Sequence, residues 1–179
     1  MHRKNVFNLL LLVTVLFITS CMDSDDEKPD NYFEVNGEKF MMSEAYIDDD
    51  GTDNEITYRS YDILLCDSKE TKGNYVQFTT LSNSTLRLEE GTYSYKYFLE
   101  KGYFGNPEIG MNIEYDSKGQ AINGTRYTEY NMNNIMGSVI ITQEEGDYKF
   151  VINLSFEVDG VAKTAKVIYW GPLSEDYFL

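Results

Sequence analysis

Aromatic side chains are the residues of this chain whose type and spacing most plainly suggest chemistry. Tyr93, Tyr95 and Tyr97 alternate, so an extended strand would place them on one face. Tyr103 follows shortly after, and Trp170 is the single tryptophan. Aromatic rings stack on the apolar faces of sugars while their polar ends stay wet. These five residues form a candidate ligand-binding surface, and the alternative for any one tyrosine is a place in the core.

The densest acidic stretch is residues 48–55, and it suggests cation binding. Ca²⁺ prefers several oxygen ligands on a turning backbone, so a loosely built calcium site is one interpretation. The EF-hand pattern is excluded, because its glycine stands sixth, and counting back from Gly51 places Tyr46 where an acid is required. A solvated hairpin end is the alternative. The candidate ligands are Asp48, Asp50, Asp53 and Glu55.

Side chains that commonly act in catalysis are scarce. The only histidine is His2, and the only cysteines are Cys21 and Cys66. If residues 1–20 are removed, the chain has no histidine base, no histidine metal ligand and no Ser–His or Cys–His pair. Paired carboxylates could hydrolyse a glycoside, but nothing among 30 acidic residues selects one pair. We therefore expect a protein that is not an enzyme and that needs no cofactor.

The charge of the chain limits its partners. A formal net charge of −15 over 179 residues opposes electrostatic attraction to nucleic acid or to an anionic membrane surface. The same charge would attract cations or basic partners. No glycine-rich phosphate loop, zinc-ligand spacing or nucleophile elbow is present.

Alternation of apolar and polar residues dominates the chain from residue 32 onward, and no convincing helix is present. The clearest strand covers residues 148–158 and is followed by Asp159-Gly160, a two-residue turn that favours a type I′ hairpin. This turn predicts the register of the hairpin. The expected pairs include Val158 with Val161, Leu154 with Ala165, Ile152 with Val167, Phe150 with Tyr169 and Lys149 with Trp170.

Two further turns predict strand pairing. A four-residue loop at 144–147 would pair Ile141 with Phe150, whereas a three-residue loop would reverse every side chain, so burial favours the longer loop. Asn36-Gly37 is the second strong hairpin signal. It predicts that Phe33 lies opposite Phe40 and that Tyr32 lies opposite Met41.

About nine strands in one domain predict an all-β fold. We expect a single antiparallel β-sandwich, with an up-and-down, lipocalin-like barrel as the alternative. Cys66 ends an apolar run and is expected to be a buried, inert thiol. Besides the hairpins above, strands are expected at 56–66, 74–81, 92–99 and 109–115, with a weaker one at 125–131.

The first residues have the features of an export signal. His2, Arg3 and Lys4 are basic, and the apolar run 9–18 is shorter than the roughly 20 residues that a membrane-spanning helix needs. Ile18-Thr19-Ser20-Cys21 resembles the lipobox of bacterial lipoproteins, in which Cys21 would be lipidated after removal of residues 1–20. An ordinary signal with an incidental cysteine is the alternative.

Asp23-Ser24-Asp25-Asp26-Glu27 follows this cysteine and resembles the surface-export tether of Bacteroidota-type lipoproteins. The resemblance implies a lipid-anchored protein of the outer membrane that faces the extracellular side. It divides the chain into a signal peptide at 1–20, a lipidated cysteine with its tether at 21–31, and a β domain at 32–179. Removal of the signal would also make the domain more acidic by two charges, and lipidation of Cys21 would exclude an intramolecular disulfide. A solvated linker is the simpler interpretation of the acidic run.

The domain itself resembles small, β-rich Bacteroidota lipoprotein domains of unknown function. The segments that carry the resemblance are 88–93, 137–141 and 169–173. It implies a β-sandwich and assigns no functional residues.

Together these features favour a non-catalytic binding module at the cell surface, with a glycan or glycoprotein as ligand. One alternative is a structural protein, such as an adhesin or an accessory subunit of a surface assembly. The other is a histidine-free enzyme or an inhibitor. The covalent lipid on Cys21 is the one prosthetic group expected, apart from the calcium alternative, and no nucleic acid partner is expected.

Overall fold

The fold is known from a computed structural model that describes residues 30–51, 58–68 and 73–175. The predictions of a signal peptide at 1–20 and of lipidation at Cys21 fall outside these residues, as do Asp53, Glu55 and all of the predicted 21–31 tether except its last two residues. Within the described part, the model shows no helix with the length and apolar character that crossing a membrane requires.

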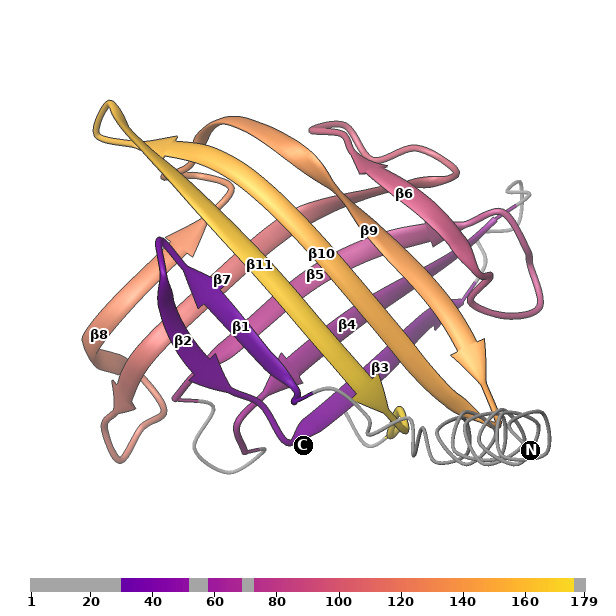
Figure 1. The fold of residues 1–179 in the computed structure, drawn as a ribbon, viewed down its shortest axis with the longest axis horizontal. Coiled ribbons are helices and arrows are strands. Elements are labelled where there is room, and N and C mark those ends of the chain that lie inside the picture. Colours follow the sequence, from indigo (N-terminus) through magenta and orange to yellow (C-terminus); the bar gives the residue numbers. More distant parts are fainter. Residues whose placement is uncertain (1–29, 52–57, 69–72, 176–179) are drawn as a thin grey trace, which may run out of the picture.

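The described chain is all-β, as predicted, and it has more strands than the expected nine (Figure 1). The strands are β1 (Tyr32–Val35), β2 (Glu38–Met41), β3 (Glu44–Gly51), β4 (Arg59–Cys66), β5 (Tyr75–Ser82), β6 (Gly91–Tyr95), β7 (Tyr103–Tyr115), β8 (Ala121–Thr128), β9 (Asn133–Glu144), β10 (Asp147–Val158) and β11 (Val161–Gly171).

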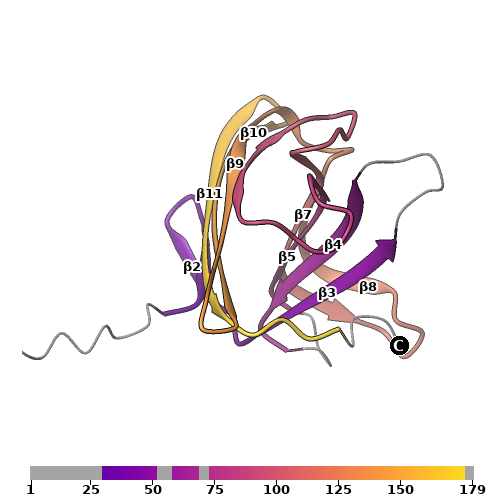
Figure 2. The same cartoon turned by 90° about the vertical axis from the view of Figure 1, so that its right-hand side faces the viewer.

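All eleven strands belong to one sheet with the order β2-β1-β11-β10-β9-β6-β7-β5-β4-β3, and β8 pairs with β7 beside this path. The sheet curls into a half-barrel, so that β9, β10 and β11 face β4, β5 and β7 (Figure 2). The expected β-sandwich would have two separate sheets, whereas here one sheet forms both layers. Strand β6 joins them, because it pairs antiparallel with β9 on one side and parallel with β7 on the other. Hydrogen bonding therefore continues from one layer into the next.

The main core lies between these two layers. Phe78 of β5 makes edge-on ring contacts with Phe104 of β7 and with Phe150 of β10, each at 6.1 Å between centroids. All three rings are almost fully buried. Burial of each such side chain contributes about 1.5–3 kcal/mol, so these rings hold the layers together.

The hairpin predictions are confirmed. Asp159 and Gly160 have positive φ angles of 52° and 75°, and they set the predicted register of β10 against β11. Asn36-Gly37 does the same for β1 and β2, with Phe33 opposite Phe40. The pairing of β9 with β10 also follows the longer-loop register. Cys66 is buried, as expected.

Several strand boundaries were predicted wrongly. β3 occupies Glu44–Gly51, where the sequence indicated the start of an acidic loop, because its apolar residues pair with β4. β7 starts at Tyr103 rather than at residue 109 and passes Pro107 through a register shift opposite β5. Proline is tolerated at such bulges. β6 ends at Tyr95 rather than at residue 99, and β8 covers Ala121–Thr128 rather than 125–131.

Candidate functional site

A pocket of about 450 Å³ lies between the loop that follows β6 and the loop that joins β8 to β9. It is termed the aromatic pocket below. Its polar and aromatic lining consists of Tyr95, Tyr97, Glu129, Tyr130, Asn133 and Asn134, and Met132 and Ile135 add apolar contacts.

The β6 side of the aromatic pocket is held firmly at Tyr95. The Tyr95 ring packs edge-on against Phe104, with centroids 5.8 Å apart, and its hydroxyl donates to Oε1 of Glu129 at 2.8 Å. Burial, followed by the bond to Glu129, raises the pKa of Tyr95 above its ordinary value, so this phenol keeps its proton and remains a donor. Tyr97 is 59% exposed and contacts the ring of Phe98.

The loop after β6 folds back onto β7 because Gly105 has no side chain. A Cβ atom at Gly105 would stand 2.6 Å from Cδ1 of Leu99 and 3.0 Å from the carbonyl oxygen of Lys96. The backbone N–H of Lys96 also donates to the carbonyl of Phe104 at 2.9 Å. These contacts bring Tyr97 beside Tyr95 at the rim of the pocket.

The β8–β9 side of the aromatic pocket is held by Asn131 and Met132. Oδ1 of Asn131 accepts from the backbone N–H of Thr128 at 2.8 Å, and its Nδ2 donates to the carbonyl of Arg126 at 3.0 Å. Met132 is buried in the main core. The turn between Thr128 and Asn131 is therefore fixed, and it presents half-buried Glu129 together with Tyr130, which is 96% exposed.

Several polar atoms of the pocket have no hydrogen-bond partner among the described residues. They include Oε2 of Glu129, the side-chain amide of Asn133 and the hydroxyls of Tyr97 and Tyr130. Asn134, at a positive φ of 51°, donates through Nδ2 to Oε2 of Glu157 at 3.0 Å, which orients its amide. The pocket thus offers both donors and acceptors to a ligand.

The five aromatic residues predicted from the sequence do not form one surface. Tyr95 and Tyr97 line the aromatic pocket. Tyr93 lies in the core, which was the alternative for each tyrosine. Its ring is buried, and its hydroxyl donates to the carbonyl of Glu89 at 2.9 Å. Tyr103 is half-buried outside the pocket lining, with Nζ of Lys96 at 4.9 Å from its ring centroid.

Trp170 lies far from the aromatic pocket. It is half-buried on β11, where Nζ of Lys149 is 5.4 Å from its ring centroid and where its backbone exchanges hydrogen bonds with the side chain of Asn31. Trp170 pairs with Lys149 of β10, whereas Asn133 pairs with Glu157. These positions on β10 are eight residues apart, which is roughly 26 Å of strand.

The sequence analysis missed Glu129, Tyr130, Asn133 and Asn134. The strand expected at 125–131 extends over this loop, because β8 ends at Thr128. The signal that could have found it is composition, because residues 127–134 read Tyr-Thr-Glu-Tyr-Asn-Met-Asn-Asn. Tyrosine and asparagine combine ring faces with adaptable hydrogen bonding, and loops rich in both are typical of recognition surfaces.

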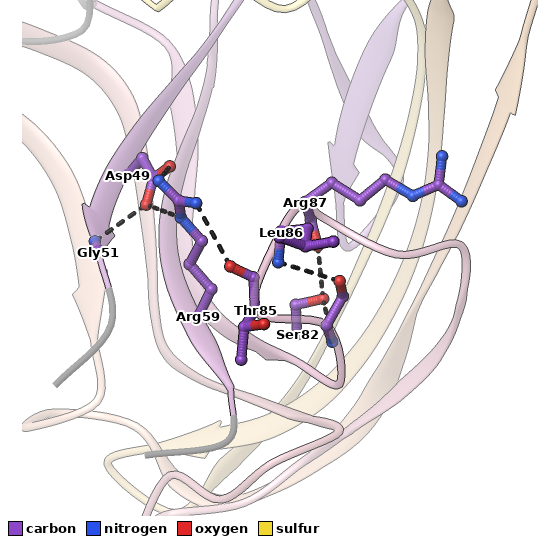
Figure 3. Close-up of polar contacts among 8 residues, drawn as sticks. Asp49, Gly51, Arg59, Ser82, Thr85, Leu86 and Arg87 are labelled. Atoms are coloured by element: carbon purple, nitrogen blue, oxygen red, sulfur yellow. Dashed lines mark hydrogen bonds and ion pairs between the residues drawn. The ribbon is translucent and has the colours of Figure 1, made fainter. Parts of the chain in front are cut away.

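The described part of the acidic stretch belongs to β3, and Figure 3 shows how Asp49 is bound within the protein. The carboxylate of Asp49 accepts from Nε of Arg59 at 2.6 Å and from the backbone N–H of Gly51 at 2.9 Å. Nη1 of Arg59 also donates to the carbonyl of Thr85 at 3.4 Å, which ties β3 and β4 to the loop after β5. Oδ2 of Asp50 accepts from Ser60 at 3.2 Å.

Asp48 lies opposite Asp62 of β4. Burial raises the pKa of Asp62, and the charges of Asp50 and Asp48 act in the same direction, against the hydrogen bond from Thr79. Over the described ranges, no group of three or more His, Cys, Asp or Glu residues could hold a metal ion. The calcium interpretation stays a prediction, because two of its four ligands lie outside these ranges.

A second cleft, of about 380 Å³, lies on the outer side of β5, β7 and β8 and is termed the outer cleft. Glu108 accepts two bonds from Arg126, at 2.7 and 2.8 Å, and a third from the hydroxyl of Tyr75. Burial and the bond to Glu108 raise the pKa of Tyr75, and Glu108 also raises the pKa of Arg126. This network connects three strands and leaves Glu108 fully engaged.

The two clefts therefore differ in what they can do. The outer cleft is closed by its own ion pair, whereas the aromatic pocket has exposed rings and unpaired polar atoms. Comparison of the chain with protein-family models, with curated proteins and with solved structures finds no match.

Proposed function

We propose that the protein is a lipid-anchored, non-catalytic module that binds glycans at the cell surface through the aromatic pocket. The observation that supports this proposal is the placement of Tyr95, Tyr97 and Tyr130 around the half-buried carboxylate of Glu129. Ring faces cover the apolar side of a sugar, while carboxylate and amide groups bind its hydroxyls.

Part of the pocket is already held in place without a ligand. Tyr95 is fixed by Phe104 and Glu129, and the opposite loop is fixed by Asn131 and Met132. A site whose side chains are already ordered loses less conformational entropy when it binds. The curled sheet resembles a β-sandwich in having two facing layers, and we regard it as the scaffold that holds the two loops.

A binding role is favoured over hydrolysis by the carboxylates of the pocket. Most glycoside hydrolases use a pair of Asp or Glu residues on either side of the bond that breaks. Within the part of the chain that the structure describes, Glu129 is the one carboxylate in the pocket lining. Glu157 accepts a hydrogen bond from the lining residue Asn134 and does not itself line the pocket.

The position of the pocket suits a protein anchored through its N-terminal segment. In the view of Figure 1, β1 (Tyr32–Val35) starts in the lower part of the molecule, whereas β6 (Gly91–Tyr95) ends in the upper part. An anchor at Cys21 would therefore leave the aromatic pocket facing away from the membrane. Cys21→Ser should move the protein from the membrane fraction to the soluble fraction, and unchanged fractionation would contradict lipid anchoring.

A glycan array tests ligand binding. The purified full chain should bind a defined set of glycans, and the double variant Tyr97→Ala/Tyr130→Ala should lose that binding. Tyr115→Ala is the matched control, because Tyr115 is also a partly exposed tyrosine but lines the outer cleft. A blank array with the wild type, or equal binding by the double variant, would contradict the proposal.

A second candidate, protein contact in a surface assembly, is favoured by one feature of the outer sheet face. Val151 pairs with Ile140 and Ile168, and Tyr32 pairs with Ile168 and Met41, so an apolar row crosses β9, β10, β11, β1 and β2. Met41 is 53% exposed. Cross-linking from this row on intact cells should recover a protein neighbour if the protein is an accessory subunit, and recovery of none would count against that role.

A further inference from the structure

The charge of the aromatic pocket narrows the class of glycan that it can bind. Among the described residues, Glu129 is the single charged residue in the pocket lining, and no Lys or Arg lines the pocket. Its Oε1 accepts from Tyr95, while its Oε2 has no partner among the described residues. A half-buried carboxylate interacts more strongly with a nearby charge than one in bulk water does, because less solvent screens it.

The three rings add to this negative potential. The face of an aromatic ring attracts a cation within about 6 Å of its centre, by roughly 0.5–2 kcal/mol. Tyr95, Tyr97 and Tyr130 all line the same pocket as the carboxylate of Glu129. Several rings around one carboxylate form an arrangement suited to an ammonium group.

Among the described residues, the basic side chains on segments next to the pocket are engaged with other groups, including Lys163, whose Nζ lies 5.5 Å from the ring centroid of Tyr127. Lys96 forms an ion pair with Glu100 at 2.5 Å, and its Nζ lies over the ring of Tyr103. Arg126 is bound through two nitrogens to Glu108. The negative charge in the pocket is therefore left for a ligand to balance.

We propose that the aromatic pocket selects a glycan that carries a free ammonium group, as a non-acetylated amino sugar does. This inference rests on the proposed function, because it names the ligand class of the same site. The rings of Tyr97 and Tyr130 cover the sugar, and Oε2 of Glu129 accepts from its ammonium group. Acetylation removes the positive charge, and a uronic acid adds a negative charge that Glu129 repels.

Isothermal titration with three oligosaccharides of equal length tests this selection: an oligomer of glucosamine, one of N-acetylglucosamine and one that contains glucuronate. The wild type should bind the glucosamine oligomer at least about tenfold more tightly than the acetylated one, which corresponds to about 1.4 kcal/mol. Binding of the glucuronate oligomer should be the weakest. In Glu129→Gln, which keeps an acceptor for Tyr95, the preference for glucosamine should disappear.

A control variant distinguishes binding by Glu129 from non-specific attraction of a cationic ligand to the negative charge of the whole chain. Glu114→Gln changes the net charge by the same amount at an exposed position of β7 outside the pocket lining, and it should keep the preference. Equal loss of the preference in Glu114→Gln and Glu129→Gln would overturn the inference, because non-specific attraction would then explain it. Equal or tighter binding of the acetylated oligomer would also overturn it while leaving glycan binding intact. If none of the three oligomers binds and the array is blank, the proposed function fails as well.

Discussion

The aromatic pocket and the outer cleft each contain a tyrosine that donates a hydrogen bond to a glutamate. In the outer cleft these are Tyr75 and Glu108, and in the aromatic pocket they are Tyr95 and Glu129. The two pairs differ in whether an arginine joins them. Arg126 donates to both carboxylate oxygens of Glu108, whereas Glu129 accepts from Tyr95 alone among the described residues.

The comparison shows how one pair of side chains can serve two purposes. With an arginine, the pair becomes a closed network that joins β5, β7 and β8 and contributes to stability. Without one, a carboxylate and its surrounding rings keep unused binding capacity. Unused polar groups in a fixed site are a cost to folding that a ligand can offset.

The largest contrast should come from truncating one tyrosine in each region. Tyr75 is 5% exposed and packs in a second buried cluster with Leu64 and Ile113, so Tyr75→Ala should lower the free energy of unfolding by about 3–5 kcal/mol. Tyr130→Ala should change it by less than about 0.5 kcal/mol. Urea unfolding of both variants measures the difference, and similar losses would contradict the division of roles.

The second-largest effect should be a loss of stability at high pH, caused by the buried tyrosines. Burial raises the pKa of Tyr61 and of Tyr169 to about 12, from an ordinary value of 10.0. The unfolded chain then loses these protons first, so the stability that they contribute is complete below pH 10 and is lost as pH rises from 10 to 12. The loss is about 2–3 kcal/mol for each tyrosine. Unfolding midpoints across this range should fall less in Tyr61→Phe, and an unchanged fall would contradict the assignment.

Removing the charge of each glutamate should produce a smaller contrast. Glu108→Gln leaves Arg126 without its ion pair and should cost about 1–3 kcal/mol, toward the low end because Arg126 is half exposed to water. Glu129→Gln breaks no ion pair in the described structure and should be close to neutral. Thermal unfolding compares the two variants, and a larger loss for Glu129→Gln would reverse the comparison.

The smallest effect is expected from the support of the aromatic pocket rather than its lining. Asn131→Ala removes two hydrogen bonds that hold the β8–β9 loop, so it should cost about 1 kcal/mol of stability and weaken glycan binding. Asn123→Ala, on the neighbouring strand, is the control and should leave binding unchanged. Full binding by Asn131→Ala would show that the fixed turn is not needed.

Local signals explain which parts of this fold could be predicted. Asp159-Gly160 and Asn36-Gly37 determine the register of their hairpins through their own backbone preferences, and alternation then decides which face is buried. The parallel pairing of β6 with β7 has no such signal. It depends on how the loop after β6 packs over Gly105, which is a tertiary contact.

The same reasoning explains why only the β6 side of the aromatic pocket contains residues predicted from the sequence. Tyr95 and Tyr97 stand out because they alternate in one segment. Glu129 is 34 positions away from Tyr95, and no pattern in either segment indicates that the two side chains meet. Trp170 could not be placed relative to these tyrosines for a related reason, because being the only tryptophan says nothing about which end of the sheet it occupies.

Amide chemical-shift mapping tests the central claim most directly. The strongest glycan from the array is titrated into the full chain, and shifts are followed across both clefts. The account predicts that the largest changes fall on residues 95–98 and 129–135, with little change at residues 119–126 of the outer cleft. Shifts concentrated in the outer cleft, or spread evenly over the sheet, would contradict the assignment of the aromatic pocket as the binding site.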